Sequence, residues 1–175
     1  ASGLEAVSLA ASKVRSGWSE LVLAGGVESV SRVPAGSEGG PMAYDPEILN
    51  RTDYLPPGIA ADLIATIGAI GRERVDAFAL RSRQRAAEAR EKGYFQRTLV
   101  PIHDRNGMVI LDTDEFLDYA PGPEELAALP PAFREAGRRG YDDKALFRYP
   151  LIERIRHVHT TDNRAAPADG AALVL

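Results

Sequence analysis

Two histidines lie two residues apart in the segment IRHVH, residues 155–159, whose apolar and polar residues alternate as in a strand. His157 and His159 would then share one face of that strand, and imidazole nitrogens are frequent zinc ligands. A zinc site needs further ligands, and none is evident nearby in the sequence. We therefore expect no metal site. The remaining histidine, His103, lies in a predicted turn, and we expect it to be exposed.

Acidic residues give two further candidates for chemistry. Asp112, Asp114 and Glu115 could form a carboxylate pair for acid–base catalysis or a calcium loop, but their spacing lacks the glycine and terminal glutamate of an EF-hand. We interpret them as a solvated acidic loop. Glu28 lies between glycine and serine residues, and we expect it to orient the backbone at a strand end.

Cysteine is absent from the 175 residues, which excludes disulfides, thiolate metal sites and a cysteine nucleophile within them. The net charge is −4, and no lysine or arginine run is free of acids, so neither nucleic acid nor an anionic membrane is an expected partner. No apolar run approaches the roughly 18 residues of a spanning helix. We expect a cytoplasmic protein with no membrane span.

The first part of the chain predicts a helix, a strand and an irregular excursion. Helical periodicity runs over residues 2–16 and Gly17 ends it. The apolar run LVLA, residues 21–24, is typical of a buried parallel strand, and a Gly25-Gly26 turn follows. Residues 32–57 are rich in proline and glycine, which predicts an excursion from the sheet without regular elements.

The remainder predicts mostly helices. The strongest spans residues 72–92, with Gly71 as its N-cap, Gly93 just past its end, and a narrow apolar stripe that includes Phe78 and suggests close helix packing. The other expected elements are a helix at 58–70, a hairpin of 99–102 with 108–111 around Asn106-Gly107, a short helix at 124–129, and strands at 155–159 and 170–175.

Several segments resemble thiolases of fatty-acid β-oxidation, above all the thiolase β subunit of bacterial trifunctional complexes. They are ASGLEAV, AGGVESVSR, GIAADLIA, DAFALRSRQRAAEA, LPPAFRE and NRAAPADGAALVL. The resemblance implies an α/β chain: part of a thiolase-like αβαβα fold, with an incomplete N-terminal half and an α+β loop domain. Residues 1–33 and 155–175 would belong to that half, and residues 34–154 would form the loop domain that covers CoA.

The resemblance also implies where catalysis occurs. In thiolases the acyl-accepting cysteine would stand immediately before Ala1, so that Ala1, Ser2 and Gly3 form the entry of a helix whose dipole favours the thiolate. The family's Asn-Glu-Ala-Phe, Gly-His-Pro and Cys-x-Gly-Gly segments would follow Leu175. We therefore expect no catalytic residue within these 175 residues, and no thiolase activity from them alone.

Tentative CoA contacts also follow from the resemblance. Leu129 and Phe133 would lie against the pantetheine or adenine, although Phe133 could equally be a core aromatic, and residues 56–58 would lie near the acyl tunnel. Ala165 replaces a serine that hydrogen-bonds the pantetheine in relatives. In TTDNRAA, residues 160–166, Asp162 and Arg164 replace small residues, so either CoA binding is weakened or Arg164 turns outward.

Two functions remain open from the sequence. The first is part of a degradative thiolase, an acetyl-CoA C-acyltransferase of lipid degradation that cleaves 3-ketoacyl-CoA with CoA into acetyl-CoA and a shortened acyl-CoA. Its ligand would be coenzyme A as substrate, with no metal or other cofactor. The second is a non-catalytic thiolase-like protein for CoA binding or assembly. The resemblance implies a homodimer or homotetramer, and a hydratase/dehydrogenase α subunit as a further possible partner.

Overall fold

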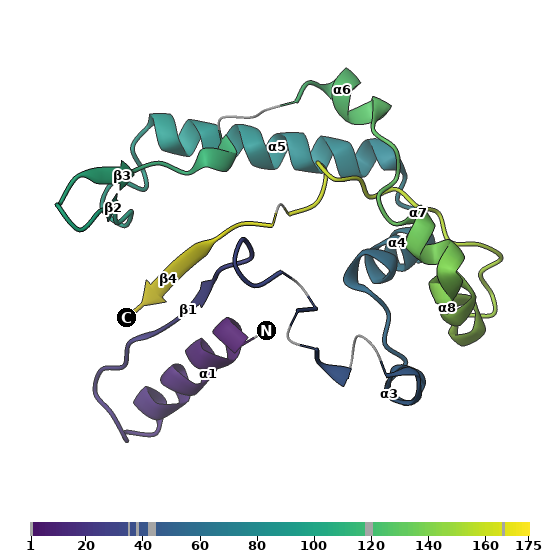
Figure 1. The fold of residues 1–175 in the computed structure, drawn as a ribbon, viewed down its shortest axis with the longest axis horizontal. Helices are drawn as coiled ribbons and strands as arrows, with labels where there is room; N and C mark the ends of the chain where they lie inside the picture. Colours follow the sequence, from purple (N-terminus) through teal and green to yellow (C-terminus); the bar gives the residue numbers. More distant parts are fainter. Residues whose placement is uncertain (1, 35, 38, 42–44, 118–120, 166) are drawn as a thin grey trace. The chain divides into compact units, whose positions relative to one another are not determined.

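The computed structural model describes residues 2–34, 36–37, 39–41, 45–117, 121–165 and 167–175. The chain divides into two compact units, which we call unit 1 (Ala1–Thr52 with Pro167–Leu175) and unit 2 (Asp53–Ala166). Figure 1 labels the α-helices and β-strands of both units, and each unit is described by itself below.

Unit 1 contains a helix, a two-stranded sheet and a short second helix. Helix α1, Ser2–Arg15, confirms the prediction for residues 2–16, and Gly17 follows it at a φ of +74°. Strands β1, Ala24–Glu28, and β4, Gly170–Val174, pair antiparallel, with Ala24 opposite Val174. The helix packs beside β1 (Figure 1).

The first strand lies later in the sequence than predicted. Residues 21–24 were expected to form a buried parallel strand before a glycine turn, whereas Gly25 and Gly26 lie inside β1 and the pairing is antiparallel. The physical reason is close strand contact, because a Cβ at Gly25 would lie 2.2 Å from the Ala172 carbonyl oxygen. The predicted burial is confirmed only at Ala24: Leu21 and Leu23 are 70% and 60% exposed, and every residue of β4 is exposed.

A short helix occupies part of the segment expected to be irregular. Helix α3, Pro46–Arg51, begins after Asp45, whose Oδ1 accepts hydrogen bonds from the backbone amides of Glu47 (2.9 Å) and Ile48 (3.2 Å). Proline at the first helical position lacks the amide that has no partner there. The Asp-Pro pair is thus a helix start that the sequence prediction missed.

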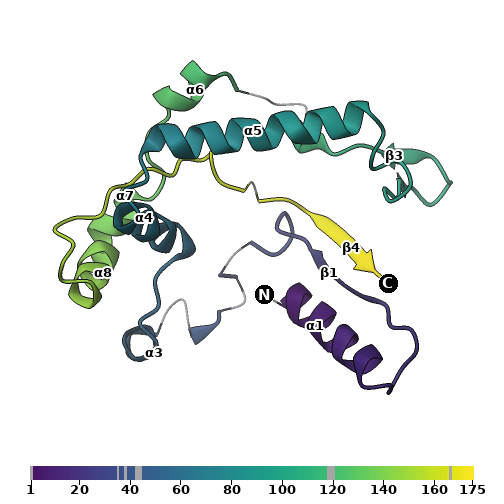
Figure 2. The ribbon, with the colours of Figure 1, turned by 180° about the vertical axis from the view of Figure 1, so that it is seen from behind.

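Unit 2 confirms most of the predicted helices. Helix α4 covers Pro57–Ile67, and helix α5 covers Arg72–Glu91 between Gly71 and Gly93, whose φ is +70°. Helix α6, Pro123–Ala128, lies beside α5 (Figure 2). The hairpin pairs β2, Ile102–His103, with β3, Val109–Leu111. The elements not predicted are a 3-10 turn η1, Glu115–Leu117, helix α7, Arg134–Ala136, a wide turn η2, Gly137–Tyr141, and helix α8, Asp142–Arg148.

The core of unit 2 lies where α4, α8 and the chain after α8 meet. Leu63, Ala145 and Ile155 are buried together, and Leu146 and Ile152 pack against them. The apolar stripe predicted for α5 is only half-buried, at Val75, Ala79, Ala86 and Ala89, and Phe78 is 66% exposed, so this helix packs beside α6 without joining the core.

Residues 155–159 form no strand. The backbone amides of Val158 and His159 donate to the Asp62 carboxylate, at 3.0 and 3.1 Å, rather than to a neighbouring strand. Ile155 and Val158, which are three residues apart, are both buried, so the burial of this segment does not follow the two-residue period of a strand either. Among the described residues, no helix is both long and apolar enough to cross a membrane.

Candidate functional site

The start of α1 lies beside the glycines of β1. Gly3 Cα is 3.8 Å from the position that a Cβ at Gly26 would occupy. Ser2 and Gly3 form the first turn of the helix, as expected, whereas Ala1 lies outside the described residues. The first amides of a helix have no partner within it and carry positive potential, so this end of α1 favours a negatively charged group.

A carboxylate joins the chain after β1 to the start of β4. Asp169 accepts from the Ser31 amide (2.9 Å) through Oδ1 and from the Ser31 hydroxyl through Oδ2. These hydrogen bonds hold the pKa of Asp169 below its usual 3.8, and the bond from the Ser31 hydroxyl has the largest effect. Nearby, Glu28 accepts from the Ser29 amide (3.1 Å), which agrees with the structural role predicted for Glu28.

In unit 2, Phe133 lies between a glycine and an arginine. A Cβ at Gly58 would lie 2.2 Å from Phe133 Cε1, so the ring packs directly on the α4 backbone. The guanidinium carbon of Arg164 is 6.0 Å from the ring centroid, at the outer limit of a cation–π contact. Thus Phe133, Arg164 and the 56–58 segment are brought together, and the ring remains half-buried.

Leu129 is placed by an arginine of α5. Arg72 Nη1 donates to the Leu129 carbonyl at 3.0 Å, Nη2 donates to the Leu126 carbonyl, and Nε pairs with Asp76 at 2.7 Å. The fork of the guanidinium therefore satisfies the last carbonyls of α6 while a carboxylate balances its charge. The Leu129 side chain itself is half-buried.

Asn163 fixes the loop that carries Arg164 and Ala165. Its Oδ1 accepts from the Thr160 amide (2.7 Å), and its Nδ2 donates to Asp76 (2.7 Å) and to the Val158 carbonyl (3.0 Å). Arg83 Nη2 adds a bond to the Asp162 carbonyl at 2.7 Å. The Asp162 side chain is half-exposed, whereas Arg164 and Ala165 are exposed.

The most connected polar cluster is one that the sequence prediction missed. Asp62, fully buried on α4, accepts from His157 Nδ1 (2.8 Å) and His159 Nδ1 (2.7 Å) as well as from the two backbone amides named above. The other ring nitrogen of His157, Nε2, lies 2.9 Å from Asp142 Oδ2 on α8. A lone acid inside the apolar run GIAADLIA was the available signal, because a buried carboxylate requires partners.

The two histidines are thus hydrogen-bonded to carboxylates. Within the described part of the chain, no three histidine, aspartate or glutamate side chains are arranged to hold a metal ion. His103 is exposed, as predicted, but it lies on β2 rather than in the turn. Asp114 accepts from the Phe116 amide (3.0 Å) at the start of η1. Asp112 and Glu115 are exposed, which agrees with a solvated acidic loop.

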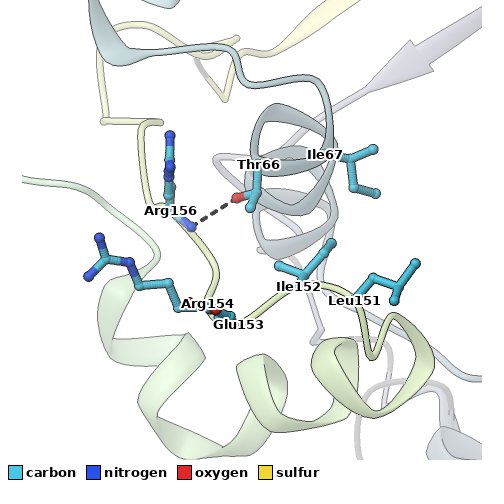
Figure 3. A pocket seen from close by; sticks show the side chains of 7 residues that line it. All are labelled: Thr66, Ile67, Leu151, Ile152, Glu153, Arg154 and Arg156. Atoms are coloured by element: carbon cyan, nitrogen blue, oxygen red, sulfur yellow. Dashed lines mark hydrogen bonds between the residues drawn. The ribbon is translucent and has the colours of Figure 1, made fainter.

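Beside this cluster, an open hollow of about 620 Å³ lies between the end of α4 and the chain after α8 (Figure 3). The Arg156 amide donates to Thr66 Oγ1 at 2.9 Å across its wall, and Thr66 Oγ1 donates to the Asp62 carbonyl at 2.7 Å. The lining residues are Thr66, Ile67, Leu151, Ile152, Glu153, Arg154 and Arg156. Two arginines and one glutamate give the rim mixed charge.

Comparison with known proteins identifies a family. Residues 1–139 match the model of the thiolase N-terminal domain. The chain is 36% identical over 151 residues to an acetyl-CoA acetyltransferase of Chromobacterium violaceum, covering 78% of this chain and 38% of that protein. It is 34% identical over 182 residues to the human peroxisomal 3-ketoacyl-CoA thiolase, covering 99% of this chain and 38% of that protein.

A solved structure is similar over nearly the whole chain. The dimeric peroxisomal thiolase of Saccharomyces cerevisiae superposes with a TM-score of 0.73 at 26% identity, over 98% of this chain and 39% of that one. This agrees with the predicted α/β fold as part of a thiolase N-terminal region. The chain therefore spans less than two fifths of the length of each of these relatives.

Proposed function

This chain belongs to the thiolase family, and from that premise we propose that it forms part of an enzyme that transfers acyl groups between 3-ketoacyl-CoA and CoA. The observation that carries the proposal is the family match, supported by the first turn of α1 lying against Gly26 of β1. A helix start in that place suits a thiolate nucleophile. From the resemblance of the first residues, ASGLEAV, to thiolases, we propose that the nucleophilic cysteine stands immediately before Ala1.

Unit 2 would supply contacts to coenzyme A. Phe133 offers an aromatic surface for the pantetheine or adenine, and Leu129 is held in place through its backbone by Arg72. Arg164, over the Phe133 ring, brings a cation to a molecule that carries phosphates. We propose that the exposed Arg164 would pair with a phosphate of CoA, while the side chain of the exposed Ala165 has no group that could hydrogen-bond the pantetheine.

Calorimetric titration of CoA into the 175-residue chain tests the CoA-binding part of the proposal. We expect binding that Phe133→Leu weakens about threefold to tenfold, because an aromatic contact contributes about 0.5–1.5 kcal/mol. Phe147→Leu is the matched control, since Phe147 is 87% exposed on α8. Absence of binding in both the unchanged chain and Arg164→Ser would reject a competent CoA pocket.

A second candidate function is a non-catalytic thiolase-like protein that binds CoA or assembles with a partner. The observation that favours it is the TTDNRAA run, in which Arg164 lies over the residue expected to meet the pantetheine. Thiolysis of acetoacetyl-CoA by the natural polypeptide distinguishes the two, because only the first requires a nucleophile, a base and an oxyanion site. For the 175 residues alone we expect no turnover.

For the assembled enzyme we further propose a homodimer or homotetramer, lipid degradation as the role, and a cytoplasmic location. The support for self-association is that the similar yeast enzyme is dimeric. A hydratase/dehydrogenase α subunit, as in bacterial trifunctional complexes, is the proposed further partner. Sedimentation of the natural polypeptide with and without such a subunit tests this assembly.

A further inference from the structure

Beyond that function, the buried cluster around Asp62 contains a histidine held between two carboxylates. His157 Nδ1 lies 2.8 Å from Asp62 Oδ2 and Nε2 lies 2.9 Å from Asp142 Oδ2. The His157 side chain is 8% exposed, Asp62 is fully buried, and Asp142 is 25% exposed. An ionised carboxylate only accepts hydrogen bonds, so both bonds form together only when each ring nitrogen carries a proton.

The two bonds join elements that are far apart in the sequence. Asp62 lies on α4 and Asp142 begins α8, while His157 belongs to the chain that runs on to the Asn163 loop. Core residues from the same three segments, Leu63, Ala145 and Ile155, are packed together. His157 therefore joins, through one side chain, the same three segments that build the core of unit 2.

Removing one proton affects the two bonds unequally. Asp62 has three other donors on Oδ1, namely the Val158 amide, the His159 amide and His159 Nδ1, so its place is fixed without His157. Asp142 Oδ1 has no hydrogen-bond partner among the described residues, which leaves Oδ2 to His157 Nε2 as the bond that holds this carboxylate. Neutral His157 would keep Nδ1–H on Asp62 and turn a lone pair toward Asp142.

We infer that His157 is a positioning residue that acts as a proton-dependent latch between α4 and α8. With both ring nitrogens protonated, the latch is closed; when the pH rises and Nε2 loses its proton, two lone pairs meet and α8 is released from His157. The titratable groups facing His157 are Asp62 from α4 and Asp142 from α8, with His159 coupled to it through the shared Asp62. The loop at residues 160–165 continues from this segment, so the latch would also affect CoA binding if the proposed function is right. That effect rests on the proposed function, whereas the latch itself does not.

Amide hydrogen exchange of α8 as a function of pH tests the latch without any ligand. We expect the protection factors of residues 145–148 to fall about tenfold or more as the pH rises, the loss that corresponds to one hydrogen bond to a charged group. Residue-specific ¹⁵N NMR of the His157 ring should show both nitrogens protonated where α8 is protected. The ring of exposed His103 serves as the comparison within the same sample.

Asp142→Asn gives the decisive comparison. An amide can donate to the lone pair of neutral His157 or accept from protonated Nε2, so the link no longer requires a second proton and the protection of α8 should become nearly independent of pH. Asp143→Asn is the matched control: the residue is exposed, adjacent and on the same helix, and the variant should follow the unchanged chain.

Three outcomes would overturn the latch. They are α8 protection in the unchanged chain that does not vary with pH, an Asp142→Asn variant that keeps the original pH course, and an Nε2 without a proton at a pH where α8 is protected. CoA titration at the two pH extremes is a separate arm. If the protection of α8 depends on pH as expected but CoA does not bind at either pH, the latch is supported and the CoA-binding part of the proposed function is rejected.

Discussion

At the scale of single residues, the contact between Phe133 and Gly58 gives a sharp prediction. A Cβ at Gly58 would lie within 2.4 Å of three Phe133 ring atoms, so Gly58→Ala must displace the ring from α4. We expect a loss of about 1–3 kcal/mol in the free energy of unfolding, as for other overpacked sites. Urea unfolding followed by circular dichroism measures it.

The matched control is the same change made without the ring. Gly58 lies in the first turn of α4, where alanine is intrinsically a better helix former than glycine by up to about 1 kcal/mol. In a Phe133→Ala background, Gly58→Ala should therefore be neutral or stabilising. Equal destabilisation in both backgrounds would show that the ring does not rest on Gly58.

Residue types indicated some site residues and not their partners. His157 and His159 were candidates in the sequence because imidazole nitrogens can bind a metal ion, and metal binding was the role considered for them. In the structure, both imidazole rings instead hydrogen-bond to Asp62, which is 95 residues away from His157 in the sequence. Such a pairing depends on how α4 packs against the chain after α8, and no local pattern encodes that packing.

At the scale of elements, Arg72 is predicted to fasten α5 to the end of α6. Its guanidinium reaches two carbonyls of the α6 end and Asp76 at once, and the Arg72 side chain is 22% exposed. Arg72→Lys keeps the charge but loses the fork, so we expect a destabilisation of about 1–3 kcal/mol.

Thermal unfolding and urea unfolding both measure this loss. Arg74→Lys is the control, because Arg74 is exposed on the same helix and two residues away. An Arg72→Lys variant as stable as Arg74→Lys would mean that one donor is sufficient at this helix end.

A second element-scale prediction concerns the pH dependence of unit 1. The pKa of Asp169 is lowered by its bonds from Ser31, so these bonds stabilise the folded chain above the ordinary value of 3.8 and are lost as the pH falls through the lowered pKa. The stability difference between the unchanged chain and Ser31→Ala should be constant from pH 5 upward and should shrink in acid.

The same comparison can be made by NMR titration of the carboxyl carbons. Ser31→Ala should return the pKa of Asp169 toward its ordinary value. The pKa of Asp104, which the Met108 amide lowers in the β2–β3 hairpin, should not change. Equal shifts in both groups would indicate a general effect of the substitution.

Elements with a local signal were predictable, and those without one were not. Helices α1, α4, α5 and α6 follow from periodicity and from glycine or proline at their ends. The hairpin follows from Asn106-Gly107. Residues 155–159 carry the same alternation as a strand, yet their amides bind a side chain, and η2 with α8 begins in a glycine- and arginine-rich segment that lacks helical periodicity.

At the scale of the whole molecule, the two units differ in how much apolar surface they bury. Among the described residues, unit 1 has Ala24 as its only buried hydrophobic residue, whereas unit 2 buries Ile59, Leu63, Ala65, Leu126, Ala145, Ile155 and Val158. Burial of apolar side chains is the main source of folding free energy. Sequence patterns predicted buried strands in unit 1 because they report which residues are apolar, not what covers them.

This difference predicts that the 175-residue chain does not unfold as one cooperative body. We expect peptides from α1 and β1 to exchange their amide hydrogens at low urea concentrations, where α4 is still protected, because unit 1 has little burial to oppose opening. Hydrogen exchange with mass spectrometry at increasing urea measures both units in one sample. Gly58→Ala should lower the urea concentration at which α4 loses protection and leave that of α1 unchanged, since Gly58 and Phe133 both belong to unit 2. If α1 and α4 instead lose protection together, and Gly58→Ala shifts both, the units are energetically coupled and burial within each does not determine its stability.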